Sequence, residues 1–243
     1  ELPFELLLTS AAPVSFLVTV GWIVIVSNAF NLIDGIDGLT AGVSVITALT
    51  VFLLANQNGA TVPVIAALAL SGALAGFLRF NLPPARIFLG DAGALSIGYV
   101  TAVLAMASYQ KSPAAVALIV PLLVLGLPLL DPILAVLRRG LSHLRRRGAE
   151  GLRPGEMLHA VTLADRGHLH HLLLRNGLSV SESLAVLYAV CIALAAVGLG
   201  AREASTTLRW GLFLALICAG FASLRALERR ARAFRPALGV AVR

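Results

Sequence analysis

The chain has 243 residues, of which 58% are hydrophobic and 13% charged, and its mean hydropathy is +0.91. This composition excludes a soluble globular protein, because too few polar side chains remain to cover its surface. Aromatic residues make up only 6%, and the apolar residues form helix-length runs without the alternation of a β-barrel. We therefore expect an all-α, polytopic membrane bundle that forms a single membrane domain over residues 1–243.

Seven apolar segments are long enough, or nearly so with tilt, to span a bilayer. They are residues 11–30, 39–55, 62–78, 92–108, 113–137, 183–200 and 208–224. Helices are expected throughout, because lipid offers no hydrogen-bond partner to an exposed peptide group. The chain begins without methionine and without a basic region before its first apolar run. We therefore expect no signal peptide and a chain truncated at its N-terminus.

Basic residues set the expected orientation, since cytoplasmic loops carry the excess of lysine and arginine. If the connection after the first segment is cytoplasmic, 16 of the 19 basic residues lie on the cytoplasmic side. They include those of a long cytoplasmic loop, residues 138–181, and of a basic cytoplasmic tail, residues 225–243. Basic loops next to membranes also hold anionic lipid headgroups, so the net charge of +7 predicts no nucleic-acid partner. We expect a multi-pass protein of the inner (cytoplasmic) membrane whose polar chemistry faces the cytoplasm.

The first polar motif is NAFNLIDGIDGLTAG, residues 28–42. If the backbone stays helical, Asn31, Asp34 and Asp37 lie close to one side of the helix. Three glycines alternate with them and would let a ligand approach the main chain: Gly35, Gly38 and Gly42. The alternative is a helix-to-helix turn in which glycines end the first helix and an aspartate caps the next.

The second motif, RFNLPPARIFLGDAG, covers residues 79–93. Its two prolines, Pro83 and Pro84, prevent a continuous helix. Asp91 stands just before the fourth apolar run, where it could cap a helix. It could also hold a divalent cation, because Mg²⁺ prefers one or two carboxylates together with phosphate oxygens and water.

The third motif, ADRGHLHHLLLRNGLS, lies in the long loop at residues 164–179. His168 and His171 stand at i and i+3 with His170 between them, and Arg166 precedes them. Such histidines could bind zinc, act as acid or base, or donate hydrogen bonds to phosphate. The adjacent arginine favours an anionic ligand, since a guanidinium engages phosphate through two hydrogen bonds. A purely interfacial histidine cluster is the alternative.

Together with PLLDPILAVLRR at residues 128–139, these motifs resemble, in order and spacing, the polyprenyl-phosphate N-acetylhexosamine-1-phosphate transferases of glycosyltransferase family 4 type. The HLHH form preceded by Asp-Arg is similar to the branch that transfers GlcNAc-1-phosphate to undecaprenyl phosphate. The resemblance implies that a UDP-sugar and a polyprenyl phosphate lipid react to polyprenyl diphosphate sugar and UMP. This would be the first membrane step of a cell-envelope polysaccharide, such as lipopolysaccharide or teichoic acid.

The resemblance also implies roles for individual residues. Asp91 would hold Mg²⁺, with Mn²⁺ as an alternative ion and Asn31 as a second ligand. Asp34 and Asp37 would line the nucleotide and diphosphate site. The uridine side would be contacted by Asn81 and Phe88. The diphosphate or sugar would be gripped by Arg166, His168, His170 and His171.

The chain departs from the family pattern in lacking an upstream pair of adjacent aspartates and a lysine near the nucleotide. We therefore expect this chain alone to be inactive. Three other functions remain open: a phospho-MurNAc-pentapeptide transferase-like activity, a non-catalytic membrane protein, and a transporter component. A homodimer is one option for its assembly.

Overall fold

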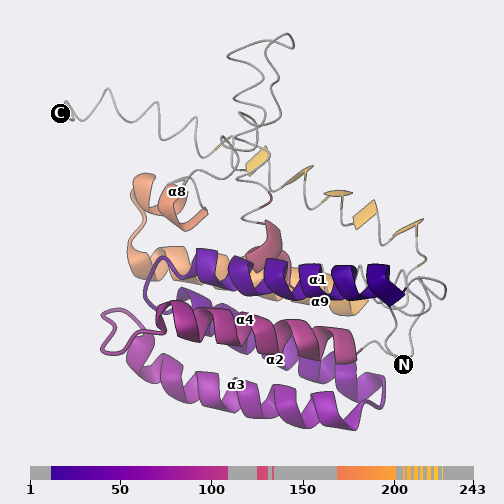
Figure 1. Ribbon diagram of the computed structural model, residues 1–243. Coiled ribbons are helices and arrows are strands. Elements are labelled where there is room, and N and C mark those ends of the chain that lie inside the picture. Colours follow the sequence, from indigo (N-terminus) through magenta and orange to yellow (C-terminus); the bar gives the residue numbers. More distant parts are fainter. Residues whose placement is uncertain are drawn as a thin grey trace.

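The computed structural model describes residues 12–108, 125–130, 133, 169–200 and scattered positions between 205 and 226. The elements within these residues are α-helices, which confirms the predicted all-α fold. They are α1 (Ala12–Ile33), α2 (Leu39–Gln57), α3 (Thr61–Asn81), α4 (Gly90–Ala107), α8 (Leu169–Arg175) and α9 (Val180–Gly200). Figure 1 shows the five long helices aligned in one bundle, with the short α8 at one end.

Five described helices are long and apolar enough to cross a membrane: α1, α2, α3, α4 and α9. They correspond to five of the seven predicted segments, and the chain is a multi-pass membrane protein. The other two segments, residues 113–137 and 208–224, lie largely outside the described residues, as does most of the loop at 138–181.

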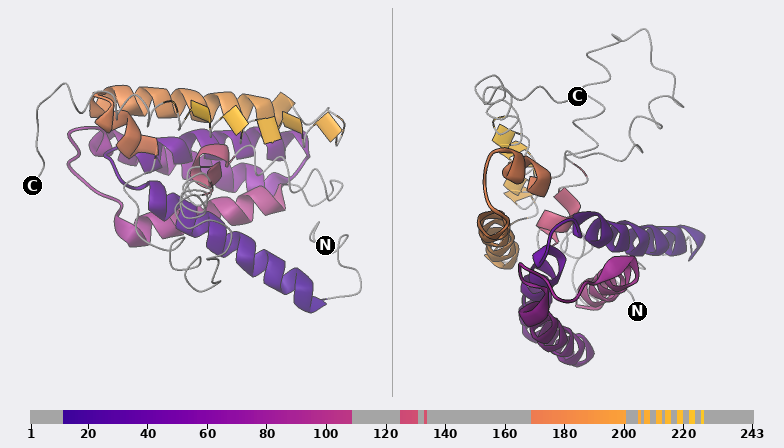
Figure 2. Two further views of the ribbon diagram at one scale, coloured as in Figure 1. Left: turned by 90° about the horizontal axis from the view of Figure 1, so that it is seen from above. Right: turned by 90° about the vertical axis from the view of Figure 1, so that its left-hand side faces the viewer.

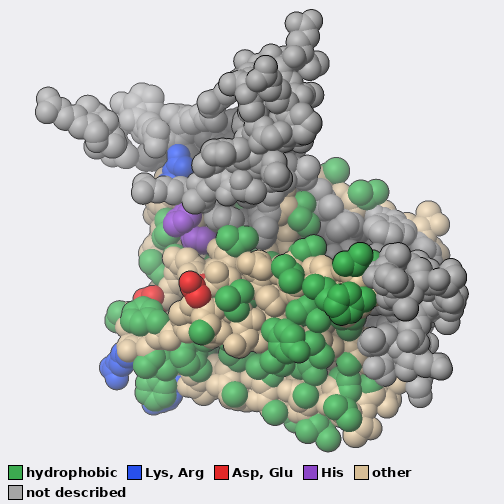
Figure 3. Space-filling view, viewed as in Figure 1, with side chains coloured by type: hydrophobic (Ala, Val, Ile, Leu, Met, Phe, Trp, Pro, Cys, Tyr) green, Lys and Arg blue, Asp and Glu red, His purple; other side chains and the backbone are tan. Residues whose placement is uncertain are grey.

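The outer faces of α1 and α3 are apolar and exposed. Phe16 and Ile25 on α1 are 67% and 60% exposed, and Val62 and Ile65 on α3 are 77% and 64% exposed. On a spanning helix such side chains face lipid. Figure 3 shows hydrophobic side chains over much of the visible face, while acidic, basic and histidine side chains gather toward its left-hand end.

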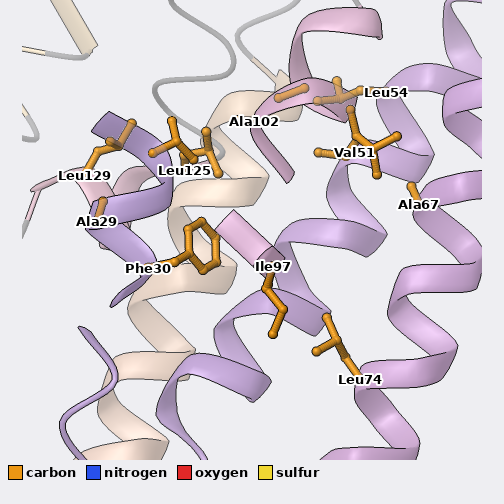
Figure 4. Close-up of a cluster of buried hydrophobic side chains, with 13 residues drawn as sticks. Ala29, Phe30, Val51, Leu54, Ala67, Leu74, Ile97, Ala102, Leu125 and Leu129 are labelled. Atoms are coloured by element: carbon orange, nitrogen blue, oxygen red, sulfur yellow. The ribbon is translucent and has the colours of Figure 1, made fainter. Parts of the chain in front are cut away.

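Helix α2 lies in the interior of the bundle and packs against α3, α9 and α4. Of its spanning segment, 67% is buried, against 22% for those of α1 and α3. A buried cluster joins α1, α2 and α4 through Phe30, Val51, Leu54 and Ile97 (Figure 4). The side chain of Trp22 on α1 also donates a hydrogen bond to the Ala102 carbonyl of α4, 3.2 Å away.

The α1–α2 and α3–α4 connections lie at one end of the bundle, because two spans separate them along the chain. Helix α8 lies at the same end (Figure 1), and Figure 2 shows the bundle from above and from this end. Here α9 starts with a reciprocal cap. Ser179 donates from its backbone N–H and its hydroxyl to Glu182 Oε2, both at 2.8 Å, and the Glu182 N–H donates back to Ser179 Oγ. The first two polar motifs and the described part of the third, residues 169–179, therefore lie at one end of the bundle.

Candidate functional site

The first polar motif is a turn, which confirms the helix-to-helix alternative and excludes a helix that continues through Asp37. Helix α1 ends at Ile33, where the Gly35 N–H turns back to the Ile33 carbonyl at 2.7 Å. Gly38 then has a φ of 82°, a left-handed conformation that residues other than glycine adopt only with strain. Asp34 and Asp37 consequently lie on a tight connection between two spans, at the polar end of the bundle.

Neither aspartate of this turn caps α2, so the capping part of the turn alternative is wrong. The N-cap position is Gly38, and no side chain donates or accepts a capping hydrogen bond there. The Asp37 carboxylate accepts a hydrogen bond from the Ala85 N–H at 3.0 Å instead. Because Ala85 belongs to the α3–α4 connection, this bond joins the first two motifs directly.

Asn81 at the end of α3 makes a second link between the two connections. Its side chain is 6% exposed; Oδ1 accepts from the Gly38 N–H at 3.1 Å, and Nδ2 donates to the Ile87 carbonyl at 2.8 Å. The amide can still accept or donate one further bond at each end. Asn81 therefore positions the turn, and its predicted contact with a substrate stays a prediction.

Asp91 lies in the first turn of α4, which begins at Gly90, and its side chain is exposed. The N-cap position is Leu89 and has no side-chain capping bond. The nearby Asp91 charge acts on Asp34 across the two connections. Partial burial is the main cause that raises the pKa of Asp34; the Thr40 hydroxyl opposes this rise, and the Asp91 charge adds to it. The charges of these two aspartates, from different connections, therefore interact, and carboxylates are ligands that a divalent cation prefers.

Because the pKa of Asp34 is raised, its charged form should lower the stability of the folded protein as pH rises. Between its ordinary value of 3.8 and the raised value, the native state binds more protons than the unfolded chain, so stability falls as pH rises. An Asp34→Asn variant without divalent cations should melt above the parent at pH 8, and the gap should close as pH falls toward 4. We expect less than about 1 kcal/mol, or roughly 2–4 °C, because the side chain is only partly buried and solvent screens its charge. A variant melting below the parent at pH 8 would contradict the assignment.

The glycines of the first motif are covered by protein side chains, whereas the sequence suggested that they admit a ligand. A Cβ built at Gly35 would collide with the His170 imidazole, lying 2.7 Å from Cε1. One built at Gly42 would collide with the Tyr188 ring, lying 2.5 Å from Cε1. Small residues are needed here because α8 and α9 pack on the turn and on α2.

The described histidines lie beside the turn. His170 is 2% exposed with its ring against Gly35, while His171 is half-buried with its ring centroid 4.2 Å from that of His170. Burial makes His170 a wall of the site, and His171 is the more accessible of the two. His168 and Arg166 lie outside the described residues. Phe88, in the α3–α4 connection, is 70% exposed.

The oxygen atoms at this end suit a hard divalent cation. The Oδ1 atom of Asn31 is buried and accepts no hydrogen bond from the described residues, although buried amides are normally paired. Asp34 and Asp91 supply carboxylates from the two connections at this end. The described ranges contain no cluster of three or more His, Cys, Asp or Glu side chains. Mg²⁺ does not need such a cluster, since phosphate and water complete its shell.

Tyr188 on α9 was not predicted from the sequence. Its hydroxyl donates to the Gly38 carbonyl at 2.5 Å. In the sequence it is a single tyrosine within an apolar run, and nothing in that run indicates a partner 150 residues away.

Comparison with known proteins relates this site to one family. The family model of glycosyl transferase family 4 matches residues 2–109, which include Asn31, Asp34, Asp37 and Asp91. The chain is 36% identical over 172 residues to a probable undecaprenyl-phosphate N-acetylglucosaminyl 1-phosphate transferase of Bacillus subtilis strain 168. That alignment covers 71% of this chain and 44% of the relative.

Two further relatives have a lower and a higher sequence identity to this chain. The undecaprenyl-phosphate alpha-N-acetylglucosaminyl 1-phosphate transferase of Escherichia coli K12 is 26% identical over 198 residues, covering 80% of this chain and 50% of the relative. The phospho-N-acetylmuramoyl-pentapeptide-transferase of Lacticaseibacillus paracasei is 43% identical over 102 residues, covering 42% of this chain and 32% of the relative. The chain spans half or less of the length of these relatives. By its family-model match over residues 2–109, its relatives and its helical membrane architecture, the chain is similar to members of glycosyl transferase family 4.

Proposed function

We propose that this chain carries the nucleotide and metal side of an Mg²⁺-dependent phosphoglycosyl transferase. The reaction transfers GlcNAc-1-phosphate from UDP-GlcNAc to a polyprenyl phosphate such as undecaprenyl phosphate, and it releases UMP. The observation that carries the proposal is that the two connections bearing Asp34, Asp37 and Asp91 lie at one end of a membrane bundle and are joined by the hydrogen bond from the Ala85 N–H to Asp37.

The comparisons support the choice of sugar. The two relatives whose alignments cover 71% and 80% of this chain are both named as undecaprenyl-phosphate N-acetylglucosaminyl 1-phosphate transferases. The similarity to the pentapeptide transferase covers only 42% of the chain. We therefore place GlcNAc-1-phosphate transfer ahead of transfer of phospho-MurNAc-pentapeptide.

The residues fit the demands of phosphoryl transfer, which are mainly alignment and stabilisation of charge on the phosphate oxygens. Asp91 and the buried Oδ1 of Asn31 would hold Mg²⁺. When bound, this ion neutralises the diphosphate and makes UMP a better leaving group. Asp37, fixed through one oxygen by the Ala85 N–H, keeps the other to accept a hydrogen bond from the nucleotide. The exposed Phe88 ring offers a face on which the uracil can stack.

The lipid phosphate would approach along the membrane. Leu32, directly between Asn31 and Ile33, is 47% exposed, and Ile25 two turns earlier is 60% exposed. A polyprenyl chain can lie on this apolar face of α1 while its phosphate reaches the turn. Arg79 and Arg86 belong to the same end of the bundle, so the excess of basic residues supports a cytoplasmic site in the inner membrane.

Lipid labelling tests the proposal. Membranes containing the full-length protein, expressed from its complete reading frame, should convert labelled UDP-GlcNAc and undecaprenyl phosphate into a lipid-linked sugar with release of UMP. Chelation of divalent cations with EDTA should abolish the product, and Mg²⁺ or Mn²⁺ should restore it. UDP-MurNAc-pentapeptide serves as the competing donor. The proposal fails if no labelled lipid forms, or if the pentapeptide donor is used faster than UDP-GlcNAc.

A further inference from the structure

Tyr188 on α9 contacts the turn that carries the two aspartates. Its hydroxyl donates to the Gly38 carbonyl at 2.5 Å, and its ring is half-buried. We propose that Tyr188 is a positioning residue of the nucleotide site: by holding the Gly38 carbonyl, it keeps the adjacent Asp37 carboxylate in its binding orientation. The inference rests on the proposed function, since Asp37 is taken to bind the nucleotide.

The Gly38 residue is held on both sides. Its N–H donates to Asn81 Oδ1 on α3, and its carbonyl accepts from Tyr188 on α9. Gly38 has a φ of 82°, and glycine can also adopt negative φ values at little cost. The two hydrogen-bond partners therefore select one of these conformations. Asp37 precedes Gly38 and is itself bound to the Ala85 N–H. Contacts from the end of α3, from α9 and from the α3–α4 connection therefore define the direction of one carboxylate.

The ring of Tyr188 packs closely against Gly38 and Gly42. A Cβ at Gly42 would overlap the phenol ring, and a Cβ at Gly38 would lie 3.5 Å from the hydroxyl and 3.3 Å from Leu184 Cδ1. Leu184 and Leu187, both buried on α9, pack with Leu39 and Val43 of α2 in the same apolar cluster. The phenol is thus confined on several sides, and its hydroxyl meets the Gly38 carbonyl where little water competes for it.

The expected effect on binding follows from losing this single bond. A Tyr188→Phe variant keeps the ring and its packing but leaves the Gly38 carbonyl without this donor. The turn then samples more conformations, so part of the binding free energy of the nucleotide is used to order it. We expect UMP to bind about three- to ten-fold more weakly, the range for one neutral hydrogen bond.

The test compares Tyr188→Phe with Tyr99→Phe in the full-length protein. Tyr99 lies on α4, is 53% exposed and serves as the matched control. Two quantities are measured: the Kd for UMP with Mg²⁺, well below the melting temperature, and amide hydrogen exchange of residues 34–42 without nucleotide. A tyrosine with only a structural role would lower the melting temperature but leave the Kd of the folded protein unchanged.

The inference is supported if Tyr188→Phe weakens UMP binding and speeds exchange in residues 34–42, while Tyr99→Phe changes neither. It is overturned if the Kd stays at the parent value, whatever happens to exchange. It is likewise overturned if exchange in residues 34–42 does not change. If the parent itself fails to bind UMP, the proposed function fails, and the exchange comparison alone then decides whether Tyr188 holds the turn.

Discussion

Replacing Asp91 with asparagine should lower the rate of lipid-linked GlcNAc formation by on the order of 100- to 1,000-fold. The substitution preserves shape but removes the negative charge that would hold the divalent cation against the diphosphate. Asp91 is exposed in the first turn of α4, where it makes no capping bond, so the helix does not depend on its carboxylate. Initial rates with UDP-GlcNAc and undecaprenyl phosphate, measured over a range of Mg²⁺ concentrations, check the prediction.

Glu182→Gln is the matched control for Asp91→Asn. It removes one carboxylate charge at the start of α9, where Glu182 accepts hydrogen bonds from Ser179. Its rate should stay within about two-fold of the parent, because salt screens an exposed charge that has no role in the proposed site. Melting temperatures verify that both variants fold. If Asp91→Asn makes as much lipid-linked sugar as the parent, Asp91 has no part in the reaction.

The largest effect on stability should come from Gly98→Ala in α4. The added Cβ would lie 2.6 Å from Ser27 Cα and 3.1 Å from the Ser27 carbonyl oxygen, so the α1 backbone would have to move. The Phe30 Cβ is also only 3.2 Å away. Overpacking of this kind costs about 1–3 kcal/mol, and a change of 1 kcal/mol shifts the melting temperature of a chain this size by roughly 2–4 °C. Thermal unfolding in detergent measures the change.

Gly72→Ala in α3 controls for the change in helix propensity. A Cβ at Gly72 meets no described atom within 4 Å, so the same substitution should be neutral or slightly stabilising there. Equal melting temperatures for the two variants would show that the close approach of α1 and α4 does not limit stability.

The spans and their shared polar end could be predicted because lipid imposes strong rules on the sequence. The predicted segment at residues 62–78 lies within α3, Thr61–Asn81, and Pro83 and Pro84 end that helix as expected. Alternation of short connections and spans then requires the first two motifs to share an end. This is why Asp37 and Asp91 could be placed at one end of the bundle from the order of the spans, whereas their assignment to one site came from the family resemblance.

The contacts within the site could not be predicted, because they depend on helix packing rather than on local pattern. The glycines of the first motif have the same appearance in sequence whether a ligand or a side chain covers them, and here His170 and Tyr188 cover Gly35 and Gly42. Asp37 could cap a helix by its position, yet its carboxylate accepts from Ala85 on another connection. Partners so distant in sequence leave no periodic signal.

Helix α9 lies beyond residues 2–109, the part of the chain that the family model matches, yet it supplies the donor to Gly38. Grafting the aspartate motif from one relative into another would therefore transplant the carboxylates without the hydroxyl that steadies their backbone. A working chimera should exchange residues 28–42 and the first three turns of α9, which include Tyr188, as a unit, keeping the glycine at 42 wherever a tyrosine occupies 188.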